Sequence, residues 1–197
     1  MQFSFFKNQQ SGRSTVEILG VLAIVGVLSI AGISGYAKVM EKMRIDNTIE
    51  QIATIIRNIQ SFYKDQKDFS NLENKNIINW GVIVPKNMVV DSKTLVNPFN
   101  GSVKIRSISY DKGFVIAYNG LPKKACVAVA STDWGTKASG ITHLFVSPSG
   151  YELPRYFPEY LDNGEHPASE LPLSIEQATK DCWCVNSTCG IIFFYQK

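Results

Sequence analysis

The feature that most constrains this chain is an uncharged apolar run near its start, which continues without a proline into a helical pattern. From Ile18 to Tyr36 there are 19 consecutive residues without a charge. A helix rises about 1.5 Å per residue, so the run reaches about 28 Å, close to the roughly 30 Å of a bilayer core. The run therefore predicts a membrane-spanning helix over residues 18–36.

Beyond this span, isoleucines recur at steps of four and three, which places them on one face of a helix. They are Ile45, Ile49, Ile52, Ile56 and Ile59. Polar side chains fill the other faces, and no proline occurs before Pro85. We therefore expect one helix from about Ser14 to about Lys64. Its first half is apolar on every face, and its second half is amphipathic.

A carboxylate, Glu17, stands at the start of the apolar run. A charge in lipid costs about 2.5–3.5 kcal/mol or more, so this position requires an explanation. One explanation is a simple membrane anchor whose glutamate reaches back to the interface. A cleaved secretory signal is another, because residues 31–35 supply small side chains after the apolar run. The isoleucine pattern beyond the span argues against a disposable signal.

Length and charge limit the classes of protein to which this chain can belong. Its 197 residues are enough for one domain and an appendage, and its net charge is only +3. The nearest approach to a basic cluster is made by Lys104, Arg106, Lys112, Lys123 and Lys124. This set is small and dispersed, so we do not expect nucleic-acid binding. His143 and His166 lack metal-ligand spacing, and no catalytic motif is present. We expect no enzyme activity, no cofactor and no metal.

All four cysteines, Cys126, Cys182, Cys184 and Cys189, follow the span. This distribution favours a cytoplasmic N-terminus and an oxidising compartment for the rest of the chain. Four cysteines allow three disulfide connectivities. A zinc site at the C-x-C pair is the alternative, although the partner motif that zinc sites contain is missing.

After residue 66 the composition becomes turn-rich, and strand-like runs, the first of which alternates, then predict antiparallel strands with one face toward the isoleucines. These strands are expected at residues 103–110, 114–118, 142–146 and 191–195. Pro122 can start a short helix that carries Cys126. Ser174 can cap a second helix, with Gln177 completing a capping box. Residues 147–172 hold five prolines and four Tyr or Phe rings, which predicts an ordered surface loop or, alternatively, a binding surface.

Gly12, then four residues, then Glu17, an uncharged span and a long amphipathic helix together resemble the N-terminus of type IV prepilins and pseudopilins. Further segments look like the middle and the cysteine-bearing helices of type IVb-like pilins: "GVIVPKNMV", "TLVNPFNGSVKI", "GLPKKACVAVAS" and "SIEQATKDC". The resemblance implies an α+β type IV pilin fold, in which the long N-terminal helix packs on a C-terminal antiparallel sheet. The implied parts are a leader at 1–12, a helix at 13–64 and a head domain at 65–197.

The same resemblance implies specific roles for single residues. A prepilin peptidase would cut after Gly12 and methylate the new amine of Arg13, although Arg13 and Thr15 stand where apolar residues are usual. In a filament, Glu17 would meet the amine of a neighbouring subunit and set the register between copies. The resemblance also implies a disulfide between Cys126 and Cys182, which leaves Cys184 and Cys189 as the second pair.

The implied function is that of a structural subunit of a type IV-pilus-like filament. Its partners would be further copies, related minor pilins, the peptidase and the assembly machinery. The precursor would lie in the bacterial inner membrane with a periplasmic head, and the assembled form in an extracellular pilus. Two alternatives stay open: a type II secretion pseudopilin in a periplasmic pseudopilus, and a single-pass membrane anchor that carries a periplasmic binding module.

Overall fold

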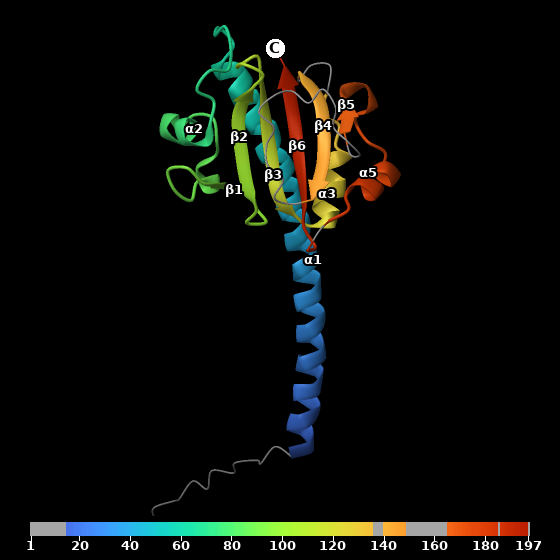
Figure 1. Ribbon diagram of the computed structural model, residues 1–197. Helices are drawn as coiled ribbons and strands as arrows, with labels where there is room; N and C mark the ends of the chain where they lie inside the picture. The colour runs from blue at the N-terminus through green and yellow to red at the C-terminus, as the bar shows by residue number, and fades with distance from the viewer. Residues whose placement is uncertain (1–14, 136–139, 149–164, 185, 197) are drawn as a thin grey trace, which may run out of the picture. The chain divides into compact units, whose positions relative to one another are not determined.

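The computed structural model describes residues 15–135, 140–148, 165–184 and 186–196. The chain divides into two compact units, with the boundary between Lys42 and Met43. The first unit is helical where it is described, and the second, which we call the head, holds the other helices and strands of the described residues (Figure 1). The boundary falls inside the long helix, so the second half of that helix belongs to the head.

The long helix α1 (Thr15–Phe62) is continuous for 48 residues, close to the expected 14–64. Without a proline, no residue removes a backbone hydrogen bond from its interior. It remains helical through Gly32 and Gly35, where two glycines weaken its intrinsic propensity. By length and composition its apolar part can cross a membrane. The helix ends at Phe62, and Gln66 N–H then bonds to the Tyr63 carbonyl at 3.2 Å as the chain turns.

The head contains one six-stranded sheet whose neighbouring strands are all antiparallel, in the order β1-β2-β3-β6-β4-β5. The strands are β1 (Leu95–Val96), β2 (Ser102–Ile108), β3 (Gly113–Leu121), β4 (Ile141–Pro148), β5 (Glu165–Pro167) and β6 (Cys189–Gln196). The last strand in the sequence, β6, therefore lies between β3 and β4, in the middle of the sheet (Figure 1).

The four strands that the sequence predicts are present as β2, β3, β4 and β6. The short edge strands β1 and β5 were not predicted. The strand expected at 103–110 ends at Ile108, because Ser109, Tyr110 and Asp111 adopt left-handed φ angles of 54°, 56° and 65°. The Phe69 N–H also bonds to the Asp111 carbonyl at 2.8 Å, which holds this turn against the segment after α1.

One face of the sheet packs on the second half of α1, and we call it the inner face. Ile52, Ile55 and Ile59 are fully buried there, beside Phe114, Tyr118 and Phe193 of the central strands. Full burial of one such isoleucine contributes about 1.5–3 kcal/mol. Ile55 lies outside the predicted isoleucine stripe, so the buried face of α1 is wider than the expected one.

The opposite, outer face of the sheet also carries buried apolar side chains. This second cluster comprises Ile108, Val115, Ala117, Phe145, Ile192 and Phe194. The central strands β3 and β6 consequently lack the alternation of buried and exposed residues that one-sided antiparallel strands show. The sequence predicted packing on one face only, whereas the centre of the sheet is buried on both faces.

Short helices complete the head. They are α2 (Asn74–Trp80), η1 (Lys86–Met88), α3 (Lys123–Ala130), η2 (Ala168–Glu170) and α5 (Ile175–Asp181). As predicted, α3 follows Pro122 directly and Ser174 caps α5, its hydroxyl accepting the Gln177 N–H at 3.1 Å. Only half of the expected capping box forms, because the Gln177 side chain donates to Asp181 at 3.0 Å and does not reach back to Ser174.

Asparagine side chains hold the connections beside β2. The side-chain amide of Asn74 accepts from Ile105 N–H and donates to the Val103 carbonyl, both at 2.8 Å. These two bonds satisfy backbone groups of β2 as a neighbouring strand would. Asn97 donates to the Asn119 carbonyl at 2.8 Å. Gly101 approaches the same carbonyl so closely that any side chain there would collide with it. This contact explains the glycine in the segment "VNPFNG".

Candidate functional site

The first half of α1 presents apolar side chains that have no partner among the described residues of its own unit. Val16 is 76 % exposed, Ile24 is 64 % exposed and Ile33 is 69 % exposed, although such residues are normally buried in a soluble protein. An apolar surface of this extent marks a site of contact with lipid or with another protein. This helix surface is the first part of the candidate site.

Glu17 lies in the first turn of α1, and its side chain is exposed. The N-terminus of a helix carries partial positive charge, so a carboxylate is favourable in this turn even without a specific partner. Gly12 and Arg13, the predicted cleavage and methylation positions, lie outside the described residues. The predicted contact between Glu17 and a neighbour's amine is a contact between copies of the chain.

The second part of the candidate site is the disulfide-bonded region of the head. Cys126 of α3 is bonded to Cys182, which directly follows α5, with a Cα–Cα distance of 6.0 Å. Both cysteines are fully buried in the main core. This pairing is the one that the prepilin resemblance implies. It closes a loop of 56 residues and fastens α5 to α3, which packs on the inner face of the sheet.

The second disulfide joins Cys184 to Cys189 across a separation of five residues, with a Cα–Cα distance of 4.5 Å. It closes the turn that leads into β6, again as the resemblance implies. The chain has no free cysteine, so the alternative of a zinc site at the C-x-C pair is wrong. Trp183, between Cys182 and Cys184, is 64 % exposed.

A buried histidine joins this region to the edge of the sheet, and sequence reasoning missed it. His166 of β5 is only 7 % exposed, and carboxylates face both of its ring nitrogens. Nδ1 lies 3.0 Å from Glu170 of η2, and Nε2 lies 2.8 Å from Asp181 of α5. Gln177 donates to the same Asp181 carboxylate at 3.0 Å. Each of the pairs His166–Glu170 and Gln177–Asp181 is four residues apart, but the contact that joins the two pairs, His166 to Asp181, spans 15 residues and has no local signal.

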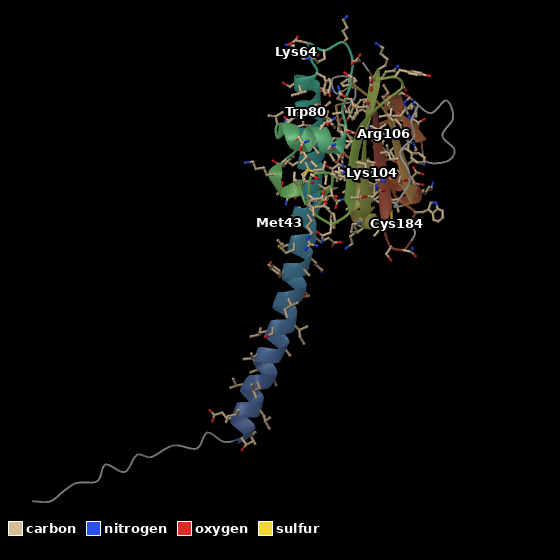
Figure 2. The ribbon with its side chains drawn as sticks, turned by 60° about the vertical axis from the view of Figure 1, so that its left-hand side comes forward. Met43, Lys64, Trp80, Lys104, Arg106 and Cys184 are labelled. Carbon is tan, nitrogen blue, oxygen red and sulfur yellow. A yellow bond between two sulfur atoms is a disulfide. The ribbon has the colours of Figure 1, made fainter. Side chains whose placement is uncertain are left out.

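The remaining predicted candidates do not form a site. Lys104 and Arg106 lie on β2 (Figure 2), where they alternate with inner-face residues and so belong to the outer face. Lys123 and Lys124 begin α3, which packs on the inner face. The basic set is therefore divided between two sides of the sheet. Within the described ranges, no group of three or more His, Cys, Asp or Glu side chains is arranged to hold a metal ion.

The comparison with known families decides the identity of the chain. The sequence profile of the PilS family, described as PilS N terminal, matches residues 42–185. The chain belongs to the PilS family of type IV pilins. The match begins where the head begins and ends before β6, so the Cys126–Cys182 disulfide lies wholly within it, whereas Cys189 of the second disulfide lies beyond its end.

Two relatives support the same assignment and indicate a type IVb-like pilin. The major structural subunit of the bundle-forming pilus of Escherichia coli O127:H6 (strain E2348/69 / EPEC) is 24 % identical over 136 residues, which are 68 % of this chain and 70 % of that protein. The crystal structure of TcpA, a type IV pilin from the El Tor biotype of Vibrio cholerae, aligns with a TM-score of 0.55 and 14 % identity. That alignment covers 78 % of this pilin and 99 % of TcpA, and it shows a shared fold.

Proposed function

We propose that this pilin is a structural subunit of a type IV-pilus-like filament. The observation that carries the proposal is the first half of α1, whose apolar side chains are exposed although the head has a buried core of its own. Such a helix requires lipid before assembly and other copies of the chain after it. The bundle-forming pilus protein, a major structural subunit of its pilus, supports the same role here. The role is structural and not enzymatic.

The proposed maturation begins with cleavage after Gly12 by a prepilin peptidase, which then methylates the amine of Arg13. In the filament, that amine pairs with Glu17 of a neighbouring copy, because a buried carboxylate is tolerable only when its charge is compensated. Before assembly, a helix that extended to residue 13 would bring Arg13 within reach of Glu17, because positions four apart share a helix face, and would compensate the carboxylate within the same chain. The exposure of Glu17 in the first turn of α1 supports both contacts.

The proposed location follows from the disulfides and the apolar helix. The precursor lies in the bacterial inner membrane with its head in the periplasm, an oxidising compartment in which the two disulfides form and persist. After assembly with further copies, minor pilins and the assembly machinery, the subunit forms part of an extracellular pilus. Nucleic acid and cofactors have no part in this function.

Cleavage is tested on filaments sheared from cells. N-terminal sequencing and intact-mass measurement should find a chain that starts at Arg13 and is one methyl group heavier than the unmodified residues 13–197. The reason is the spacing between Gly12 and Glu17 ahead of an uncharged span. A mature chain that starts near Ser34 would instead identify a secretory signal, and the filament proposal would fail.

Electron microscopy separates the filament from the two alternatives. A pilus subunit should appear in long surface fibres that antibodies against the head decorate. A type II secretion pseudopilin would be cleaved at the same position but would yield no surface fibres at its natural expression level. A single-pass anchor with a periplasmic binding module would be neither cleaved after Gly12 nor assembled.

A further inference from the structure

A small depression opens at the end of the head where α1 and β6 both end. Figure 2 shows Lys64 at this end of the head and Met43, where α1 enters it, at the other. The depression holds about 140 Å³. That volume is far above the roughly 10–15 Å³ that one water needs and below the roughly 300 Å³ of drug-sized pockets. Its size therefore suits a single small ring.

Four aromatic side chains line the depression, and their rings pack against one another in sequence. Ring centroids lie 5.3 Å apart for Tyr63 and Phe69, 4.9 Å for Phe69 and Phe114, and 4.4 Å for Phe114 and Tyr195. Tyr63 is fixed further, because its hydroxyl donates to the Ser70 carbonyl at 2.9 Å. The walls are thus apolar and rigid before any ligand arrives, which lowers the entropic cost of binding.

The Tyr195 hydroxyl is the unusual group in these walls. Tyr195 is 1 % exposed, and within the described part of the chain its hydroxyl oxygen has no hydrogen-bond partner. Leaving a buried polar group unpaired costs about 1–3 kcal/mol, so native proteins rarely do so without a reason. Burial raises the pKa of Tyr195 well above its ordinary value, which keeps the hydroxyl protonated and able to donate.

Among the residues that the structure describes, the polar rim of the depression is formed by Gln60, Lys64 and Gln196, which supply two amides and one ammonium. Lys64 and Gln196 are exposed, so their long side chains can turn toward a ligand in the depression. Two neutral amides, one ammonium and one phenol around aromatic walls form a set of hydrogen-bonding groups for a ligand that is largely uncharged.

We infer that this depression is a binding site for one hydroxylated ring, the chemistry of a monosaccharide. The C–H surface of the sugar would pack on the aromatic walls, its hydroxyls would bond to Gln60 and Gln196, and one hydroxyl would satisfy Tyr195. A site built to bond hydroxyls rejects a ring that lacks them, because its buried polar groups would then stay unpaired. The inference does not depend on the proposed filament function.

The experiment is saturation-transfer NMR on the full chain, solubilised in a detergent without a sugar headgroup. The probes are D-galactose, D-glucose, tetrahydropyran and inorganic phosphate. At least one of the two sugars should receive saturation from the protein, and tetrahydropyran, the same ring without hydroxyls, should receive much less. Phosphate has no carbon-bound protons, so its binding is followed by line broadening in phosphorus NMR; it tests whether Lys64 simply attracts anions.

Tyr195→Phe removes one oxygen and retains the ring that stacks on Phe114. It should weaken sugar binding by about tenfold, the loss expected for one buried hydrogen bond. Tyr118→Phe is the matched control, because Tyr118 is equally buried, its hydroxyl also lacks a partner within the described residues, and it does not line the depression. It should leave sugar binding unchanged. Thermal unfolding of both variants should match or exceed that of the parent chain.

Several results would overturn the inference. These are no saturation of either sugar up to its solubility limit, equal saturation of tetrahydropyran, or a signal from phosphate alone. Equal effects of Tyr195→Phe and Tyr118→Phe would also overturn it, since a general change in the core would then explain the loss. The unfolding measurement ensures that a misfolded variant is not mistaken for a weakened site.

Discussion

The two halves of α1 belong to one continuous helix, yet their apolar residues have opposite surroundings. In the first half Val27 is 69 % exposed, whereas in the second half Ile59 is fully buried. The difference does not come from local propensity, because both halves are rich in the same branched and aliphatic side chains. It comes from what lies beside them: the second half packs on the inner face of the sheet, whereas residues 15–42 include no such partner for the first half.

This contrast teaches that the two regions depend on different partners. The head completes its core within one chain and adds two disulfides, so its stability is a property of the single subunit. The first half of α1 can satisfy its surface only in lipid or against other copies. Substitutions in the two regions should therefore separate assembly from folding.

The largest expected effect is on assembly. Glu17→Ala should leave the chain folded and inserted in the membrane, since the change removes a charge from the span. It should abolish filaments, because an uncompensated amine left in a dry subunit contact costs about 3–5 kcal/mol. Membrane fractionation combined with a filament shear assay measures the two effects in the same cells.

The matched control for Glu17 is Glu176→Ala, which removes a carboxylate with an 81 % exposed side chain from the head. It should alter neither insertion nor filament yield. Normal filaments from Glu17→Ala would show that this residue is not required for assembly. The exposed apolar surface of α1 would then be sufficient for contacts between copies.

The second effect is on the stability of the head. Replacing Cys126 and Cys182 together by alanine should lower the free energy of unfolding by about 4 kcal/mol, the chain-entropy value for a loop of 56 residues. Assembly should fail as a consequence of unfolding. Urea titration of the detergent-solubilised chain, followed by near-UV circular dichroism, measures the loss.

Replacing Cys184 and Cys189 together provides the comparison, because their loop spans only five residues and the same relation gives about 2 kcal/mol. Equal losses for the two pairs would show that the length of the closed loop does not set the stability. Peptide mapping without reduction should recover both predicted pairs from exported protein.

The third effect concerns the contact between β5 and α5. His166→Ala should destabilise the head by about 1–3 kcal/mol, the cost of losing buried hydrogen bonds to charged groups. Glu170→Gln should cost less than about 1 kcal/mol, because the Glu170 side chain is 57 % exposed and water screens its charge. Urea titration of both variants tests this order, and a larger loss from Glu170→Gln would reverse our view of which carboxylate holds the histidine.

The smallest effect appears in alkali. Burial, together with the charges of Asp111 and Asp68, raises the pKa of Tyr63 to about 12 from an ordinary 10.0. The neutral hydroxyl is therefore favoured by folding, so its contribution is complete below about pH 10 and is lost as the pH rises from there towards 12. Tyr63→Phe should be slightly less stable at neutral pH, because it loses the hydrogen bond to Ser70, and should lose less stability on alkaline titration. Parallel stability curves for the two proteins would contradict this assignment.

Much of the architecture could be predicted from the sequence. The span and α1 follow from an uncharged run and an uninterrupted helical pattern, and four strands follow from strand-like runs, of which only the first alternates. The start of α5 follows from Ser174, a cap whose partner is three residues away. The cysteine pairs followed from the resemblance and not from spacing, because four cysteines admit three pairings. Cleavage after Gly12 and the role of Glu17 are still proposals.

The tertiary structure decided everything that depends on residues distant in sequence. The two- and three-residue strands β1 and β5 are too short to show a period, and they exist because a longer neighbour offers them hydrogen bonds. The position of β6 between β3 and β4 has no local signal, since strand order is a choice among long-range pairings. His166 looked isolated until η2 and α5 brought carboxylates to both sides of its ring. Local sequence determines which elements form because helical and strand periods are local properties, whereas burial and hydrogen-bond partners are set by which elements meet in the folded chain.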